Sequence, residues 1–179
     1  MSLALTLIPL PFRALTPPLG LADICYRTGM ASRPRYSHPI LFGTLVVGTL
    51  DLFDAVVFFR IRNGVPPLRI FQSIAAGLLG RSSSQMGWHS GGLGILLHYF
   101  IAFLIVSIFY AVSRGVPALR RNTLVVGMLY GVAAYVVMNY VVLPLSATTR
   151  GPFVLPVFIN GILIHTFGVG LPSAWFARD

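Results

Sequence analysis

Two carboxylates lie in an apolar stretch, Gly48 to Phe59, whose composition is otherwise that of a membrane-spanning helix. Asp51 and Asp54 are half of the four acidic residues in the whole chain. Because they are three residues apart, they project from nearly one face of a helix. An ionisable side chain that faces lipid costs roughly 2.5–3.5 kcal/mol on insertion scales, so both should face inward and meet a partner. Their chemistry is that of proton or cation acceptors.

Few other polar side chains occur in the apolar stretches, and we expect them to share one layer with the aspartates. At 1.5 Å per residue from the helix ends that face the long first loop, the aspartates lie ~12 and ~8 Å deep. The other candidates lie ~10 to ~13 Å deep. They are His98 in the second span, Asn139 in the third and His165 in the fourth. Carboxylates and imidazoles that satisfy one another there would form a site for a proton, a cation or a small ligand.

The segment 66–80 is predicted to form a short interfacial helix at the same end of the bundle. Its first residues are prolines, which suit a helix start, and its last is a glycine. At this length it is too short to cross a bilayer. Arg69, Gln72 and Ser73 form a narrow polar stripe between apolar positions at helical spacing. Arg69 and Gln72 would close the polar layer from above, with Arg69 as gate or counter-ion.

Each polar residue also has an alternative interpretation. Asn139 and Asn160 are typical of hydrogen bonds between membrane helices, which fix helix register. His98 and His165 are alternatively ligands of haem or of a divalent metal, although hydrogen-bonded neutral histidines are commoner.

Other motifs favour packing over catalysis. Gly127 and Gly131 form a GxxxG motif, which is typical of closely packed helices. The sequence has no phosphate loop, dinucleotide fingerprint, zinc-protease motif or nucleophile elbow. We therefore expect a protein that is not an enzyme.

The composition places these residues in a membrane protein. Hydrophobic residues make up 56% of the chain and charged residues 9%, with a mean hydropathy of +0.82, whereas a soluble domain has about 25% charged residues. Four continuous apolar segments are long enough to cross a bilayer, which takes roughly 20 helical residues. They lie near 40–59, 91–112, 123–145 and 156–176. The predicted fold class is all-α, an integral membrane four-helix bundle with a short interfacial helix in the first loop.

Charge and cysteine usage narrow the partners. The net charge of +9 is carried by arginines that stand between apolar runs, which indicates lipid phosphates rather than nucleic acid as their partners. A single cysteine, Cys25, excludes an internal disulfide framework and a multi-cysteine metal site. The expected partners are the lipid bilayer and either a second copy of the chain or another membrane protein. No cofactor is assigned, with haem or a metal as the alternative.

The region before the first span differs from the rest. Residues 1–29 are rich in proline, have no basic residue ahead of their apolar part and show no small-residue cleavage site, which fits a signal peptide poorly. We expect residues 1–37 to be a disordered or mis-annotated extension and residues 38–179 to be one four-span domain. More arginines flank the spans on the side of the termini, so both termini are predicted to be cytoplasmic.

Scattered residues carry a family resemblance. They are Gly48-Thr-Leu-Asp51, Pro67-Leu-Arg-Ile-Phe-Gln72, Ile74 to Gly80, Leu97-His98, Tyr130-Gly131, Asn139, Pro144-Leu-Ser146 and His165. With these, residues 40–178 resemble small bacterial four-span membrane proteins of unknown function, and are more distantly similar to the YagU-like inner-membrane proteins. The resemblance implies a helical protein of the bacterial inner membrane and supplies no activity.

Three functions follow from these observations. The first is a structural or regulatory membrane subunit whose polar layer only fixes helix register. The second is the binding or translocation of a proton, a cation or a small ligand, with Asp51 and Asp54 as acceptors and His98 and His165 as titrating partners. The third is a haem- or metal-bearing redox subunit that uses the two histidines as ligands.

Overall fold

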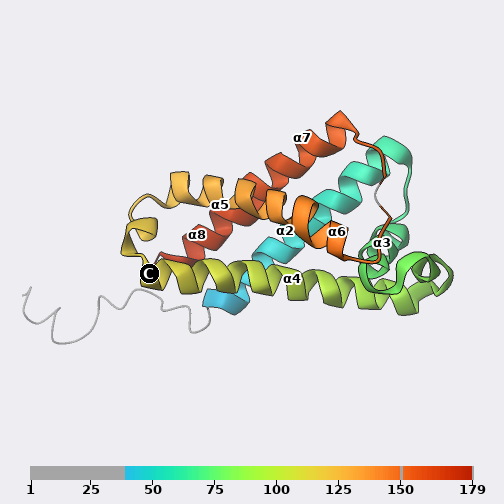
Figure 1. Cartoon of the computed structure of the whole chain (residues 1–179), viewed down its shortest axis with the longest axis horizontal. Coiled ribbons are helices and arrows are strands. Elements are labelled where there is room, and N and C mark those ends of the chain that lie inside the picture. The colour runs from blue at the N-terminus through green and yellow to red at the C-terminus, as the bar shows by residue number, and fades with distance from the viewer. Residues whose placement is uncertain (1–38, 150, 179) are drawn as a thin grey trace, which may run out of the picture. The chain divides into compact units, whose positions relative to one another are not determined.

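The computed structural model describes residues 39–149 and 151–178, which form helices joined by short connections (Figure 1). The expectation for residues 1–37 lies outside the described residues. In chain order the helices are α2 (Pro39–Asn63), α3 (Pro67–Leu79), η1 (Gly80–Gln85), α4 (Gly87–Gly115), η2 (Pro117–Arg120), α5 (Thr123–Val137), η3 (Met138–Val142), α6 (Leu143–Leu145), α7 (Leu155–Ile164), η4 (His165–Gly170) and α8 (Leu171–Ala177).

The predicted all-α four-span bundle is confirmed. Four helices are long and apolar enough to cross a membrane: Pro39–Asn63, Gly87–Gly115, Thr123–Leu145 and Leu155–Ala177. The first two are longer than the predicted 40–59 and 91–112, because helix continues through the polar residues at their ends, where arginine stems can reach the membrane surface. Many large apolar side chains point outward from these helices, so the bundle presents an apolar surface to lipid.

Local sequence sets where several helices begin and end. Pro67 is the first residue of α3, where its missing N–H has no partner to lose, and the preceding Pro66 is extended. The helix ends at Leu79, and the next residue, Gly80, has a φ of +62°, a backbone conformation that glycine adopts without strain. The third span begins after Asn122, whose side chain accepts a hydrogen bond from the backbone N–H of Val125 at 3.4 Å.

In the described residues, the third and fourth spans each contain a stretch of π-helix, and each stretch ends two residues before a proline. η3 ends at Val142 ahead of Pro144, and η4 ends at Gly170 ahead of Pro172. A proline lacks the N–H for the preceding turn, and its ring crowds the carbonyl four residues earlier. Widening that turn into a π-helix keeps the spans continuous, because the backbone groups find other partners within the same helix.

The third and fourth spans approach each other through glycines. A Cβ on Gly131 would overlap the backbone carbonyl of His165, and a Cβ on Gly170 would overlap the carbonyl of Gly127. The GxxxG pair, Gly127 and Gly131, therefore lies against η4, where backbone touches backbone.

The buried core where the first, second and fourth spans meet is also made of small and medium-sized side chains. Val47 of α2, Ala102 and Val106 of α4, and Val169 of η4 form one buried cluster. Packing of this kind lets helices come close where no hydrophobic effect from water holds them together.

The predicted interfacial helix is α3, and it packs against the beginning of α4 at one end of the bundle (Figure 1). Ile70 and Ala75 are buried in that contact, and a Cβ on Gly94 of α4 would overlap the carbonyl of Phe71. Of the predicted polar stripe, Arg69 and Ser73 are exposed, whereas Gln72 is buried, with only 3% of it exposed. Its amide is buried without an unpaired donor, because a backbone carbonyl at the start of α4 accepts from it.

Candidate functional site

The aspartates of the first span face the fourth span, where two polar side chains meet them. Asp54 lies on α2, and its Oδ2 accepts a hydrogen bond of 2.6 Å from Nδ2 of Asn160 on α7. Both residues are partly buried. A hydrogen bond to an ionised group is stronger than one between neutral groups, so this contact joins the two spans firmly when Asp54 is ionised.

Asp51 lies one helical turn before Asp54 and faces His165. Its Oδ1 is 3.9 Å from Nδ1 of His165, and the side chains are 25% and 16% exposed respectively. That distance is too long for a hydrogen bond, but a carboxylate attracts an imidazolium across it. We call Asp51, Asp54, Asn160 and His165 the Asp–His cluster.

A backbone contact fixes the neutral form of the His165 ring. Nδ1 lies 2.9 Å from the carbonyl oxygen of Gly161, one turn earlier in the same span. Because a carbonyl only accepts hydrogen bonds, Nδ1 carries the proton and Nε2 keeps a lone pair in the neutral ring. The ring also packs edge-on against the ring of Tyr135, with the centroids 5.4 Å apart. His165 therefore has one basic nitrogen, Nε2, on a ring whose Nδ1 lies 3.9 Å from a carboxylate oxygen.

The shared depth predicted that His98, on the neighbouring α4, would pair with Asp51. It does not. Its Nε2 is 2.8 Å from the carbonyl oxygen of Gly48 on α2. The reason is that Gly48 has no side chain, which lets the ring of Tyr99 pack against its backbone. A Cβ on Gly48 would lie only 2.7 Å from two carbons of that ring. This close approach brings the preceding His98 to the backbone of α2. In the part of the chain that the structure describes, the ion-pair partner of Asp51 is His165.

The remaining predicted site residues lie outside the cluster. Nδ2 of Asn139 donates to the carbonyl of Tyr135 at 3.0 Å, within its own span. Nη1 of Arg69 donates to the carbonyl of Ser84 at 3.0 Å and contacts Oε1 of Gln72 at 3.4 Å. Neither contact reaches the aspartates; the bond to Ser84 joins α3 to η1, and the role of Arg69 as gate or counter-ion stays a prediction.

Two residues of the site are not among those that the sequence predicted. Asn160, whose sequence interpretation is structural, is the partner of Asp54. The available signal was that Asn160 lies on the same span as His165 and nearer the first-loop end, just as Asp54 lies nearer that end than Asp51. Tyr135 covers His165 because Gly161 leaves room for its ring, and nothing in the sequence separates this tyrosine from the other aromatic residues.

Metal ligation has little support from the arrangement of side chains. Among the described residues, no three side chains of His, Cys, Asp or Glu gather where one metal ion would contact all of them. Comparison with family models, with curated proteins and with solved structures finds no match to this chain. The chemistry of the Asp–His cluster must therefore be argued from its own geometry.

Proposed function

We propose that this multi-pass membrane protein binds and releases a proton at the Asp–His cluster. The observation that carries the proposal is that two carboxylates and one imidazole meet across the first and fourth spans. Two ionised carboxylates three residues apart repel each other in surroundings of low dielectric, and a bound proton removes that repulsion. The cluster thus favours taking up one positive charge.

The proposed acceptor is Nε2 of His165. A proton that adds to its lone pair converts the ring into an imidazolium, and the carboxylate of Asp51, 3.9 Å from the ring, stabilises that charge. Asn160 holds Asp54 in place with its amide hydrogen bond. Loss of the proton returns the neutral ring, whose Nδ1–H remains on the carbonyl of Gly161.

A structural role, in which the cluster only fixes helix register, is the second candidate. It is favoured by the way in which His98 and Asn139 bond to backbone carbonyls and the glycines of the third span pack against η4. In that case the cluster joins two helices without exchanging a proton.

Histidine NMR of the full chain, labelled with ¹⁵N in detergent, separates the two candidates. We expect His165, assigned with a His165→Gln variant, to titrate reversibly while the protein stays folded. The ¹⁵N signals of the His165 ring should differ between the wild type and Asp51→Asn, because the carboxylate beside the ring is gone. His98 is the internal control and should not change. A His165 signal that stays neutral, or that ignores Asp51→Asn, would establish the structural role instead.

Location and family are part of the same proposal. We propose a place in the bacterial inner membrane with both termini cytoplasmic, supported by the arginine distribution and by the resemblance to YagU-like proteins. Reporter fusions after Arg121 and at the end of the chain should report the cytoplasm, and one within 82–90 the opposite side. Reversed signals at all three positions would overturn the orientation.

A further inference from the structure

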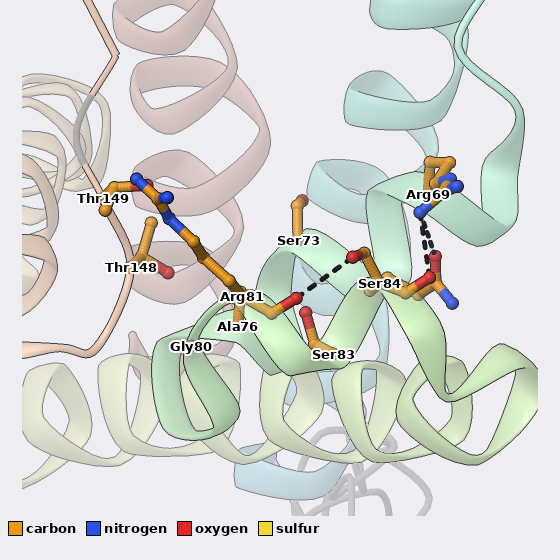
Figure 2. Close-up of a pocket in the computed structure, with 10 residues that line it drawn as sticks. Arg69, Ser73, Ala76, Gly80, Arg81, Ser83, Ser84, Thr148 and Thr149 are labelled. Atoms are coloured by element: carbon orange, nitrogen blue, oxygen red, sulfur yellow. Dashed lines mark hydrogen bonds between the residues drawn. The ribbon is translucent and has the colours of Figure 1, made fainter.

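A polar pocket of about 380 Å³ opens at the end of the bundle where α3 lies. Its walls come from α3, from η1 and from Thr148 and Thr149, which follow the third span (Figure 2). The side chains that matter for its chemistry are those of two arginines and several hydroxyl residues: Arg69, Arg81, Ser73, Ser84, Thr148 and Thr149.

Backbone contacts build this pocket from parts distant in sequence. The N–H of Ala147 donates to the carbonyl of Gly77 on α3 at 2.9 Å, which fixes the segment after the third span against α3. The N–H of Thr148 then contacts the hydroxyl of Ser146 at 3.3 Å, which shapes the turn. On the opposite wall, Arg69 is held by the carbonyl of Ser84 at 3.0 Å. The pocket is therefore a defined part of the fold.

Its charge is positive and uncompensated. The four acidic residues of the chain are Asp23, Asp51, Asp54 and Asp179, and the pocket has none of them among its lining residues. Arg81 extends across the pocket toward Thr148 and Thr149 (Figure 2). Within the described residues its guanidinium makes no hydrogen bond or ion pair, and the buried Oγ1 of Thr148 has no hydrogen-bond partner. An arginine without a partner beside an unused hydroxyl group is the chemistry that recognises a phosphoryl group.

Exposed apolar side chains place the pocket at the level of lipid headgroups. Leu145, three residues before Thr148, is 82% exposed, and Leu78 of α3 is 63% exposed. Trp88, at the start of α4, is 66% exposed, and tryptophan is enriched at membrane–water interfaces. A ligand with a phosphoryl group and acyl chains would satisfy the arginine and these apolar residues together.

We infer that the pocket formed by α3, η1, Thr148 and Thr149 binds the phosphoryl headgroup of an anionic membrane lipid. Arg81 supplies the charge, Thr148 supplies a hydroxyl group, and the backbone of α3 fixes the geometry. The site lies at the membrane surface and does not use the Asp–His cluster. It can therefore be tested independently of the proposed proton binding.

The test uses the purified full chain in a neutral detergent, with lipid binding followed by native mass spectrometry and by thermal stability. Phosphatidylglycerol should bind and raise the melting temperature more than phosphatidylcholine does. Arg81→Gln should weaken phosphatidylglycerol binding about five-fold, the effect expected for one arginine at an anionic membrane surface. Thr148→Val, which keeps the charge and shape, should weaken binding without changing the stability of the lipid-free protein.

The matched control is Arg62→Gln, which removes an exposed arginine at the same end of the bundle outside the pocket. It should leave phosphatidylglycerol binding within two-fold of the wild type. The reason is that salt screens a solvated charge beyond the Debye length, which is about 10 Å at 0.1 M salt. Inorganic phosphate that competes with phosphatidylglycerol would support the phosphoryl site and assign its natural ligand to the aqueous phase. Equal losses in Arg62→Gln and Arg81→Gln, or no loss in either, would overturn the site.

Discussion

The hydrogen bond between Asp54 and Asn160 predicts a coupling between the two residues that can be measured directly. Replacing Asn160 with leucine leaves the carboxylate of Asp54 partly buried without its partner, and replacing Asp54 leaves the amide of Asn160 unpaired. Each single variant should therefore lose stability, while the variant with both replacements leaves no unpaired group. We expect Asp54→Leu and Asn160→Leu together to lose much less than the sum of the single losses.

The size of the coupling energy reports the charge on Asp54. A hydrogen bond to a charged group contributes about 1.5–3 kcal/mol to stability, whereas hydrogen bonds between membrane helices average about 0.6 kcal/mol. With a donor–acceptor distance of 2.6 Å, we expect a coupling near the lower end of the charged range, about 1.5 kcal/mol, at neutral pH. It should decrease at acidic pH, because protonation of Asp54 turns the pair into a neutral one.

The measurement is the free energy of unfolding of the wild type, both single variants and the double variant in mixed detergent, at neutral and at acidic pH. Asp54→Leu combined with Asn139→Leu is the matched control, because Asn139 donates to Tyr135 in its own span. That control pair should be additive within about 0.5 kcal/mol. Additivity of Asp54 with Asn160 as well would refute the contact, and a coupling that ignores pH would refute an ionised Asp54.

Two further predictions concern helix packing. Gly131→Ala places a Cβ on the backbone of η4 and should cost about 1–3 kcal/mol, whereas Gly92→Ala, with open space around it, should be neutral or slightly stabilising; thermal unfolding in detergent compares them, and equal effects would contradict the close contact. Gln72→Leu removes the buried bond to the carbonyl of Gly87 and should cost about 1 kcal/mol, while Ser73→Ala on the exposed side should cost less than about 0.5 kcal/mol. A neutral Gln72→Leu would show that the bond does not stabilise α3.

The sequence predicts the spans well because their signal is local. Continuous apolar stretches, with prolines and glycines near their ends, determine the four helices and α3 to within a few residues. It predicts only that Asp51 and Asp54 need partners. Which partners they meet depends on how each span is rotated about its own axis. The depth of a residue in the membrane does not determine that rotation. His98 shares the predicted depth of Asp51, yet the close approach of Tyr99 to Gly48 turns it to a backbone carbonyl.

The same limit applies to Gln72. Helical spacing groups it with Arg69 and Ser73, which are exposed, but the residue is buried because α4 begins beside it and offers a carbonyl acceptor. Polarity alone predicts exposure, whereas the structure shows that a satisfied amide is compatible with burial. Whether Gln72 is exposed or buried is therefore decided by α4, a separate helix, and not by the sequence of α3 itself.

The π-helical stretches explain why similar polar residues take different roles in the third and fourth spans. Each stretch lies just before a proline, and near the start of each a polar side chain donates to the carbonyl four residues earlier: Asn139 to Tyr135 and His165 to Gly161. In a bilayer these bonds matter, because a widened turn needs local partners for its carbonyls. Asn139 has then used its amide within its own span. His165 has used only Nδ1, so its Nε2 remains basic and its ring remains beside Asp51. Asn139 and His165 both bond a backbone carbonyl of their own span. Only His165 can also take part in a site, because its ring has a second nitrogen.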